Sequence, residues 1–425
     1  MNVLLIGSGG RESALAWKLS QSPKLSSLTI SPGNSGTSQF GHNVHLENDN
    51  ETIRFAKENS IDLTIVGPEE PLSKGIVDKF RLENLRIFGP SKRAARIESS
   101  KIWAKKLFIK YGIPTAKSKE FNKIEDGYNF LKASDPKKWV IKVDGLAAGK
   151  GVFLPEDLNE SKIILEEIFL NKSFGSSGES IIIEEKLFGI ELSVFAFVQN
   201  SRISNIIPAC DYKRSLEMDQ GSNTGGMGAI SPPPIWNKGL EKIIQEKVMV
   251  PVVNAMEKEG CGFTGLLFGG LILTESGIKV LEFNCRFGDP ETQVIVPRIE
   301  SDLLEICYAI ADTNITSSIS VKLNSTWTVG VVIASGGYPA KYRKGYEVFG
   351  VDMSNNIDAN NSLIFQAGTK LNNESKIVTD GGRVLICIGM ANNLKHAQKV
   401  AYERVNLVSF KNMQYRKDIG EHRTL

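Results

Sequence analysis

The first ninety residues alternate short apolar runs with longer segments whose apolar residues recur at helical spacing. Strands are predicted at Val3–Ile6, Leu28–Ile30, Asp62–Val66 and Arg86–Phe88, where the apolar runs end at Gly, Pro or Ser. Helices are predicted at Arg11–Ser20, Glu51–Asn59 and Leu72–Leu82. This alternation predicts a parallel sheet, which binds its ligands at the carboxyl ends of the strands.

Beyond Tyr111 the pattern changes to longer strands. The strands predicted there are Trp139–Val143, Val152–Leu154, Ser180–Glu185, Glu191–Gln199, Phe263–Thr274, Ile278–Phe283, Val329–Ala334 and Arg383–Ile388. The predicted helices are Asp157–Leu170, Lys238–Glu259 and Asn393–Val408. Pro208–Pro234 is rich in glycine and proline, and we expect a long loop there, of the kind that forms lids or binding sites.

Composition limits the class of protein. With 425 residues the chain is long enough for several domains, and its 51 basic and 48 acidic residues nearly balance, which argues against a nucleic-acid-binding protein driven by bulk charge. The five cysteines show no C-x-x-C spacing and are expected to be reduced thiols. No apolar run reaches the ~18 residues of a membrane span, and the start lacks the basic segment of a signal peptide. We expect a cytoplasmic protein with no membrane or nucleic-acid partner.

A glycine-rich stretch follows the first predicted strand and opens the first helix, with the sequence Gly7-Ser8-Gly9-Gly10-Arg11-Glu12. Backbone N–H groups at a helix N-terminus attract anions, and glycine lets a phosphate approach the main chain. As a dinucleotide fingerprint the stretch fails, because Glu12 replaces the third glycine and no acidic residue ends the second strand. A monophosphate site is favoured over a nicotinamide site, and a purely structural turn remains an alternative.

A second glycine-rich stretch runs from Lys142 to Gly151 and joins two predicted strands. It is not a Walker loop, because no Ser or Thr follows Lys150 and a strand follows instead of a helix. Such a hairpin can fold over a triphosphate, where its amides and Lys142 would supply positive potential to the transferring phosphoryl group. Glycine hairpins are common, so a structural turn is the alternative.

Acidic residues follow the predicted strand Ser180–Glu185. Adenine needs a carbonyl and an amide from a strand edge and a ribose diol suits one carboxylate, and spacing of that sort is available in Ile181–Leu187 followed by Glu191. Without other evidence, a simple turn is the favoured interpretation here.

The strand that ends near Phe283 carries the most informative motif. With two-residue periodicity, Glu282 and Asn284 project from the same face, and two neighbouring oxygen ligands suit Mg²⁺ in the company of phosphates and water. Arg286 can lie beside the same phosphates or bind a carboxylate in a bidentate pair. Asp211 and Lys213, in the predicted long loop, offer opposite charges to a zwitterionic substrate.

Together these motifs resemble the glycinamide ribonucleotide synthetase family (phosphoribosylamine–glycine ligases) of the ATP-grasp superfamily. The resemblance extends over essentially the whole chain, and its most specific segments are Asp62–Pro71, Asp144–Gly151, Asn223–Ala229, Glu282–Thr292 and Gly336–Pro339. It implies purine biosynthesis in two steps. Glycine takes the γ-phosphate of ATP, and the amine of 5-phosphoribosylamine then attacks the acyl phosphate. Another ATP-grasp carboxylate–amine ligase or carboxylase is the alternative within this fold.

The resemblance also implies an α/β multidomain architecture. A Rossmann-like domain over 1–102 would bind phosphoribosylamine, and an ATP-grasp domain over 103–318 would carry a mobile lid subdomain at about 120–190. A small α/β or α+β domain would cover 319–425. We expect a monomer that binds glycine and 5-phosphoribosylamine and makes a transient contact with the enzyme that produces phosphoribosylamine.

Site residues carry over position by position. ATP would contact Lys101, Lys142, Gly145, Gly149, Lys150, Gly151, Glu184, Leu187 and Glu191, and Mg²⁺ or Mn²⁺ would bind Glu282 and Asn284. Phosphoribosylamine would contact Gly9, Gly10, Arg11, Glu12, Gly33, Asn34, Gly67, Pro68 and Glu69, and the catalytic candidates are Asp211, Lys213 and Arg286. Ser13 and Tyr212 stand where the family often has histidine.

Overall fold

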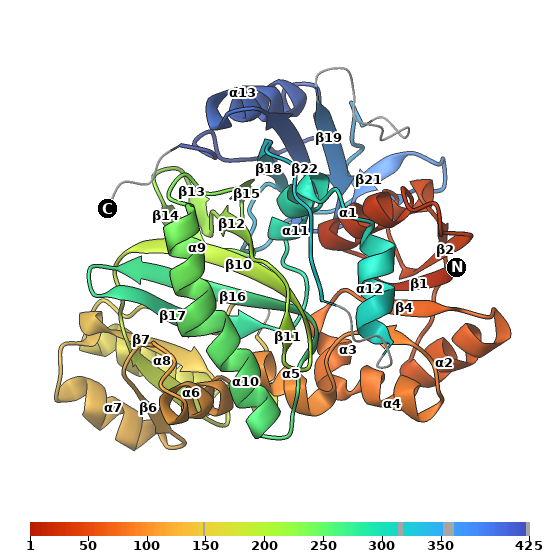
Figure 1. Ribbon diagram of the computed structural model, residues 1–425. Helices are drawn as coiled ribbons and strands as arrows, with labels where there is room; N and C mark the ends of the chain where they lie inside the picture. Colours follow the sequence, from red (N-terminus) through yellow and green to blue (C-terminus); the bar gives the residue numbers. More distant parts are fainter. Residues whose placement is uncertain (148, 313–317, 352–360, 422–425) are drawn as a thin grey trace.

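The computed structural model describes residues 1–147, 149–312, 318–351 and 361–421, and begins with a parallel sheet (Figure 1). Its strands are β1 (Asn2–Gly7), β2 (Ser27–Pro32), β3 (His42–Asn43), β4 (Leu63–Val66) and β5 (Ile87–Phe88), in the order β3-β2-β1-β4-β5. All of these neighbours pair in parallel. The predicted N-terminal parallel-sheet domain is confirmed, and its strand ends meet at one edge.

The helices of this region are α1 (Gly10–Leu19), α2 (Asp49–Glu58), α3 (Glu69–Lys74), α4 (Ile76–Leu82), α5 (Lys92–Ser99) and α6 (Lys101–Lys110). The prediction of one helix over Leu72–Leu82 is wrong. Gly75 adopts a left-handed conformation with φ 91°, which ends α3 and redirects the chain into α4.

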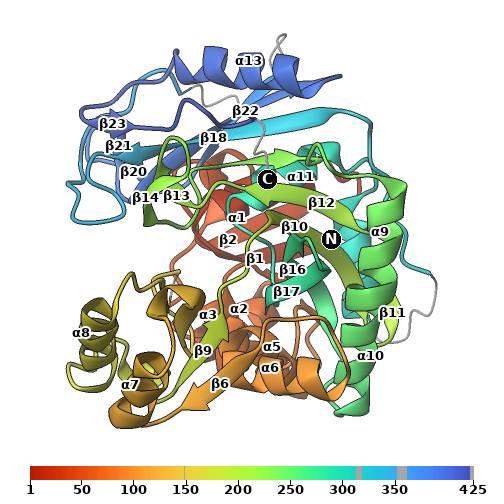
Figure 2. The same ribbon diagram turned by 90° about the vertical axis from the view of Figure 1, so that its left-hand side faces the viewer.

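A small layer with its own core projects from the molecule (Figure 2). It comprises β6 (Ser118–Phe121), α7 (Ile124–Lys132), β7 (Trp139–Val143), β8 (Val152–Phe153), α8 (Leu158–Phe169) and β9 (Ile181–Glu185), with the sheet order β6-β9-β7-β8. Leu131, Ile141 and Leu165 are fully buried between its sheet and helices. The predicted glycine hairpin is the connection between the antiparallel strands β7 and β8.

A large sheet runs through the middle and C-terminal regions in the order β17-β16-β10-β12-β15-β18-β22-β19. Its strands are β10 (Ile190–Gln199), β12 (Ile207–Asp211), β15 (Gly228–Ser231), β16 (Thr264–Thr274), β17 (Gly277–Asn284), β18 (Trp327–Ser335), β19 (Ser362–Gln366) and β22 (Arg383–Ala391). Short strands β11 (Arg202–Ile203) and β23 (Met413–Gln414) pair with β10 and β18. The sheet therefore connects the metal-site candidates on β17 with the C-terminal region.

The prediction of a long loop over Pro208–Pro234 is wrong. The segment contains β12, the hairpin β13 (Arg214–Leu216) and β14 (Gln220–Asn223), and β15. Glycine is required at 228 because a Cβ there would lie 2.7 Å from the carbonyl oxygen of Gly330 on β18. The glycine that suggested a loop thus permits close strand packing.

The remaining helices are α9 (Lys238–Ile244), α10 (Val250–Lys258), α11 (Glu291–Ile295), α12 (Leu303–Ala311) and α13 (Leu394–Val405), with a π-helical turn over Gln245–Met249. Further short strands are β20 (Thr369–Leu371) and β21 (Ile377–Thr379), and 3-10 turns cover Thr37–Gln39, Pro136–Lys138, Gly175–Gly178 and Val296–Arg298. Throughout the described ranges, no helix is both long and apolar enough to cross a membrane.

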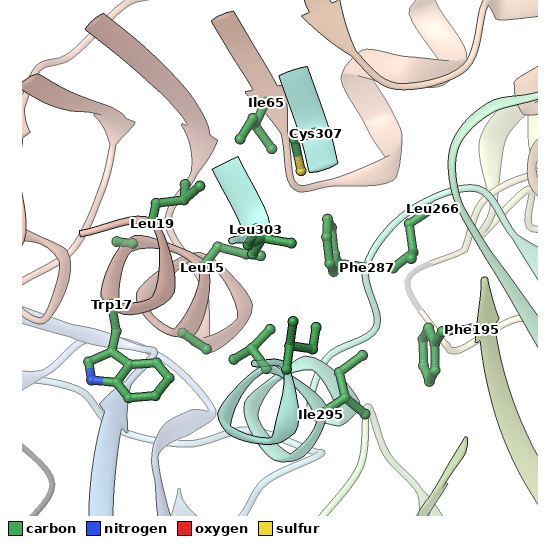
Figure 3. Packing of buried hydrophobic residues seen from close by; sticks show 14 of the residues in the cluster. Leu15, Trp17, Leu19, Ile65, Phe195, Leu266, Phe287, Ile295, Leu303 and Cys307 are labelled. Atoms are coloured by element: carbon green, nitrogen blue, oxygen red, sulfur yellow. The ribbon is translucent and has the colours of Figure 1, made fainter. Parts of the chain in front are cut away.

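One hydrophobic core joins the N-terminal sheet to the large sheet (Figure 3). Leu15 of α1, Phe287 after β17 and Ile295 of α11 belong to the same buried cluster. Trp17 of α1 packs edge-on against Phe365 of β19, with ring centroids 5.7 Å apart. Because this core is densely packed and hardly compressible, it fixes the glycine turn after β1 next to the end of β17.

Candidate active site

The glycine turn after β1 is built around the buried side chain of Glu12. Its carboxylate accepts hydrogen bonds from the backbone N–H of Gly9 and from Nε of Arg11, both at 2.6 Å. A Cβ at Gly67 would lie 1.9 Å from Glu12 Oε1, so this position must lack a side chain. Glu12 is 1% exposed and shapes the turn from within, whereas Gly9 and Gly10 line the neighbouring cleft.

That cleft has a volume of about 320 Å³ and lies between the glycine turn and the C-terminal region. Of the predicted substrate contacts, it is lined by Gly9, Gly10, Gly33 and Asn34. Sequence reasoning missed Asp289, Tyr338, Thr369, Asp380 and Arg383, which also line it. The motifs around Asp289 and Tyr338 were available signals, whereas the other three carried no recognisable pattern.

Asn34 holds the turn after β2 in place. Its side-chain oxygen accepts the backbone N–H groups of Gly36 at 2.7 Å and Thr37 at 3.0 Å, and its amide donates to the carbonyl of Ser8 at 2.8 Å. Ser13 is buried and lies 3.2 Å from the same side-chain oxygen. These bonds connect the loops after β1 and β2.

Arg286 is bound by carboxylates of the N-terminal region. Its guanidinium lies 3.1 Å from Glu69 at the start of α3 and 3.2 Å from Glu98 of α5. A third bond, of 3.3 Å, reaches the side-chain oxygen of Asn284. Burial alone would lower the pKa of Arg286, but Glu98 and Glu69 outweigh it and raise the pKa above its ordinary value. Arg286 therefore remains charged and joins β17 to the helices that carry Glu69 and Glu98.

Two lysines converge on the buried carboxylate of Glu184. Lys142 on β7 lies 2.9 Å from it and Lys105 on α6 lies 3.2 Å from it, and all three side chains are less than 10% exposed. Burial would raise the pKa of Glu184, but Lys142 and Lys105 lower it overall. Lys105 was missed by sequence reasoning. The fold thus concentrates positive charge beneath the β7–β8 hairpin.

Lys101 and the hairpin lie on the same side of this cluster. Nζ of Lys101 donates to the carbonyl of Gly145 at 3.2 Å, and burial lowers the pKa of Lys101 although the charge of Glu282 opposes this. Gly149 has φ 75° with open space around it, Lys150 is exposed, and Gly151 is buried against Val143. Ala148, part of the predicted hairpin, lies outside the described residues.

A second charged group lies at the start of β10. Glu191 pairs with Lys213 at 2.7 Å, and Lys213 lies 3.9 Å from Asp211. Burial would lower the pKa of Lys213, but Asp211, Glu191 and Glu282 raise it well above its ordinary value. Leu187 is half-buried in the β9–β10 connection. Tyr212 points elsewhere, since its hydroxyl accepts the N–H of Gly420 at 3.0 Å.

Glu282 and Asn284 lie on the same face of β17, opposite the buried Phe283. Glu282 pairs in register with Gly270 of β16, so the neighbouring strand supplies no second carboxylate at that level. Its charge acts on Lys101, Lys142 and Lys213. In the described ranges, no group of three or more His, Cys, Asp or Glu side chains could hold a metal by itself. The two side chains fit a hard cation that also binds phosphate oxygens.

The structure thus brings the predicted nucleotide, metal and catalytic residues to one junction and places the glycine turn beside it. Glu291 was missed, although it lies within the motif after β17. It is the first residue of α11, it is buried, and it lies within electrostatic reach of Arg286, Asp211 and Lys213.

Family models and relatives of known function match nearly the whole length of the chain. Models of the phosphoribosylglycinamide synthetase N domain, ATP-grasp (A) domain and C domain match residues 1–98, 99–292 and 328–422. A phosphoribosylamine–glycine ligase of Caldanaerobacter subterraneus subsp. tengcongensis is 44% identical and covers 99% of both chains. The trifunctional purine biosynthetic protein adenosine-3 of Homo sapiens is 43% identical over 98% of this chain, which spans 41% of that protein.

Solved structures show the same relationship. The phosphoribosylamine–glycine ligase of Thermotoga maritima is 32% identical, with a TM-score of 0.84 over 99% of this chain and 100% of that one. A Campylobacter jejuni biotin carboxylase in complex with a nucleotide matches at 14% identity and a TM-score of 0.74 over 99% of this chain and 94% of that one, which shows a shared fold. The fold and the site define an ATP-grasp enzyme. Within that class, the chain belongs to the phosphoribosylglycinamide synthetase family.

Proposed function

We propose that this chain joins glycine to 5-phosphoribosylamine in an ATP-dependent ligation that passes through glycyl phosphate. The products are glycinamide ribonucleotide, ADP and phosphate, so the enzyme is a carbon–nitrogen ligase of purine biosynthesis. One observation carries the proposal. The buried lysines beneath the hairpin, the Glu282–Asn284 pair and the cleft beside the glycine turn adjoin a single junction.

The nucleotide is assigned to the space between the β7–β8 hairpin and β17. Lys101 and Lys142 bind its phosphates, with Gly145, Gly149, Lys150 and Gly151 closing over them. The backbones of Glu184 and Leu187 bind adenine, and Glu191 binds the ribose. Because Glu191 also pairs with Lys213 at 2.7 Å, the ribose would share this carboxylate with that lysine.

Glu282 and Asn284 are assigned to Mg²⁺ or Mn²⁺, both of which favour oxygen ligands. A divalent ion bound there would neutralise charge on the ATP phosphates during transfer. The protein's own contribution is to align the carboxylate of glycine with the γ-phosphate and to surround both with fixed positive charge. Lys213 and Arg286 supply this charge, and Asp211 is placed to attract the amino group of glycine.

Phosphoribosylamine is assigned to the cleft of about 320 Å³. The backbone N–H groups of Gly9 and Gly10 at the start of α1 suit its phosphate. Arg11, Glu12, Gly33, Asn34, Gly67, Pro68 and Glu69 shape or border this side of the site. Arg383 lies 3.4 Å from Asp289, and both side chains line the cleft, so the C-terminal region completes it.

The decisive experiment mixes the protein with Mg-ATP, glycine and freshly generated phosphoribosylamine and measures ADP. We expect ADP formation that requires both glycine and the amine, and much less with alanine or bicarbonate in place of glycine. The absence of glycine-dependent ADP would contradict the proposal, and equal turnover with bicarbonate would favour an ATP-grasp carboxylase.

We also propose that the enzyme acts in the cytoplasm as a monomer that makes a transient contact with the enzyme supplying its labile amine substrate. Light scattering of the purified protein, alone and with that enzyme, tests the monomeric state and the transient contact. A stable dimer at micromolar concentration would contradict the monomeric state.

A further inference from the structure

Glu291 is a buried carboxylate for which the assigned reaction has so far no use. It is 4% exposed, Ser193 Oγ donates to its Oε1 at 3.5 Å, and a hydrogen bond from its own backbone N–H also acts on the carboxylate. The side chain folds back over the preceding turn, since a Cβ at Gly288 would lie 2.4 Å from Oε2. It forms no ion pair with any residue in the described part of the chain. Burying a carboxylate without a paired cation costs free energy, so we expect Glu291 to serve a function.

Charged groups approach Glu291 from several elements. Those whose charges act on it or respond to it are Asp211 and Lys213 at the end of β12, Arg286 after β17, and Arg383 on β22. The neighbouring helix α1 carries Arg11 and Glu12, which pair with each other, and Asp289 of the preceding turn pairs with Arg383. Burial, and after it the like charge of Asp211, raises the pKa of Glu291 to about 7 despite Arg286 and Lys213.

Glu291 also lies within electrostatic reach of charged groups from both halves of the site. In one half, Asp289 and Arg383 line the cleft assigned to phosphoribosylamine. In the other half, Lys213 pairs with Glu191, the residue assigned to the ribose of the nucleotide. The amine and the acyl phosphate must meet where the two halves join, and Glu291, the first residue of α11, interacts electrostatically with residues of both halves.

We propose that Glu291 is a catalytic residue that accepts the proton lost by the amine in the second step, an inference that rests on the proposed function. The lone pair of the amine nitrogen attacks the carbonyl carbon of glycyl phosphate, and the carbon–nitrogen bond forms. A proton leaves that nitrogen for the Glu291 carboxylate. The bond between the carbonyl carbon and the phosphate oxygen breaks, and its electron pair stays with the phosphate. The proton then passes to the phosphate, which departs as hydrogen phosphate, and the carboxylate is restored.

The test separates the two steps by using Glu291→Gln, which keeps the shape and removes the proton acceptor. Glycine-dependent positional isotope exchange in ATP labelled at the β–γ bridge reports the first step, and amide formation with phosphoribosylamine reports the second. We expect exchange within about threefold of the parent and amide formation about 100-fold slower, the scale of a lost general base. Glu275→Gln, on the exposed β16–β17 turn, is the matched control and should behave as the parent.

The pH profile gives a second readout. Amide formation by the parent should increase as the pH rises through about 7, where Glu291 loses its proton, and this increase should be absent in Glu291→Gln. Normal amide formation by the variant, or loss of isotope exchange together with amide formation, would overturn the assignment. Failure of the parent to show any glycine-dependent exchange would instead contradict the proposed function.

Discussion

Replacing Arg286 by methionine should destabilise the junction between β17 and the N-terminal region. The guanidinium lies 3.1 Å from Glu69 and 3.2 Å from Glu98, and the Arg286 and Glu98 side chains are 16% and 7% exposed. Removing one partner of a buried ion pair typically costs about 3–5 kcal/mol. In the variant, Glu69 can still be solvated because it is 28% exposed, and Glu98 still accepts a hydrogen bond from the backbone N–H of Cys285, 2.8 Å away. We therefore expect the lower end, about 3 kcal/mol.

The assay is equilibrium urea unfolding of the parent, Arg286→Met, Glu98→Gln and the double variant, followed by tryptophan fluorescence. Because Glu98→Gln removes one of the charges that Arg286→Met leaves unpaired, the double variant should lose less stability than the sum of the single variants. A coupling free energy of about 1–3 kcal/mol is expected for groups in contact.

The effect should depend on pH in a defined direction. Burial would raise the pKa of Glu69, but Arg286 and then Arg11 lower it, so this carboxylate stabilises the fold at neutral pH and loses that contribution as the pH falls through its folded pKa. In Arg286→Met, protonation of Glu69 and Glu98 removes charges that no longer have a partner. The difference in free energy of unfolding between the parent and the variant should therefore become smaller below about pH 4. A coupling free energy below about 0.5 kcal/mol would refute this account of the junction. So would a stability difference between the parent and Arg286→Met that does not change with pH.

Three further substitutions test the site. Glu282→Ala should lower turnover by at least about 100-fold, because charge stabilisation of the transferring phosphoryl group is lost, whereas Glu275→Ala on the same hairpin should not. Arg383→Leu should raise the KM for phosphoribosylamine about tenfold and leave the KM for ATP unchanged, since a charged hydrogen bond contributes about 1.5–3 kcal/mol. Gly67→Ala should lower the free energy of unfolding by about 1–3 kcal/mol, because its Cβ would displace the carboxylate of Glu12.

Each of these outcomes has a clear opposite. Normal turnover in Glu282→Ala would remove that residue from the metal site. An equal rise of both KM values in Arg383→Leu would indicate a general structural role, and an unchanged thermal midpoint in Gly67→Ala would show that the Glu12 turn can shift without cost.

The sequence by itself determined the local elements and the chemistry that they carry. The parallel sheet followed from the alternation of short apolar runs and helical spacing over the first ninety residues. The same-face position of Glu282 and Asn284 followed from strand periodicity alone. Both are properties of near neighbours along the chain, so backbone geometry is sufficient to predict them.

Tertiary structure decided which distant residues meet. Pairing between β12, β15 and β18 turned a predicted loop into the middle of a sheet, because buried strands tolerate glycine where backbones approach closely. The same packing set Lys105 against Glu184, Arg383 against Asp289, and Glu291 within electrostatic reach of both halves of the site. No local pattern encodes these contacts, because each joins segments that only the folded core brings within a few ångströms of one another.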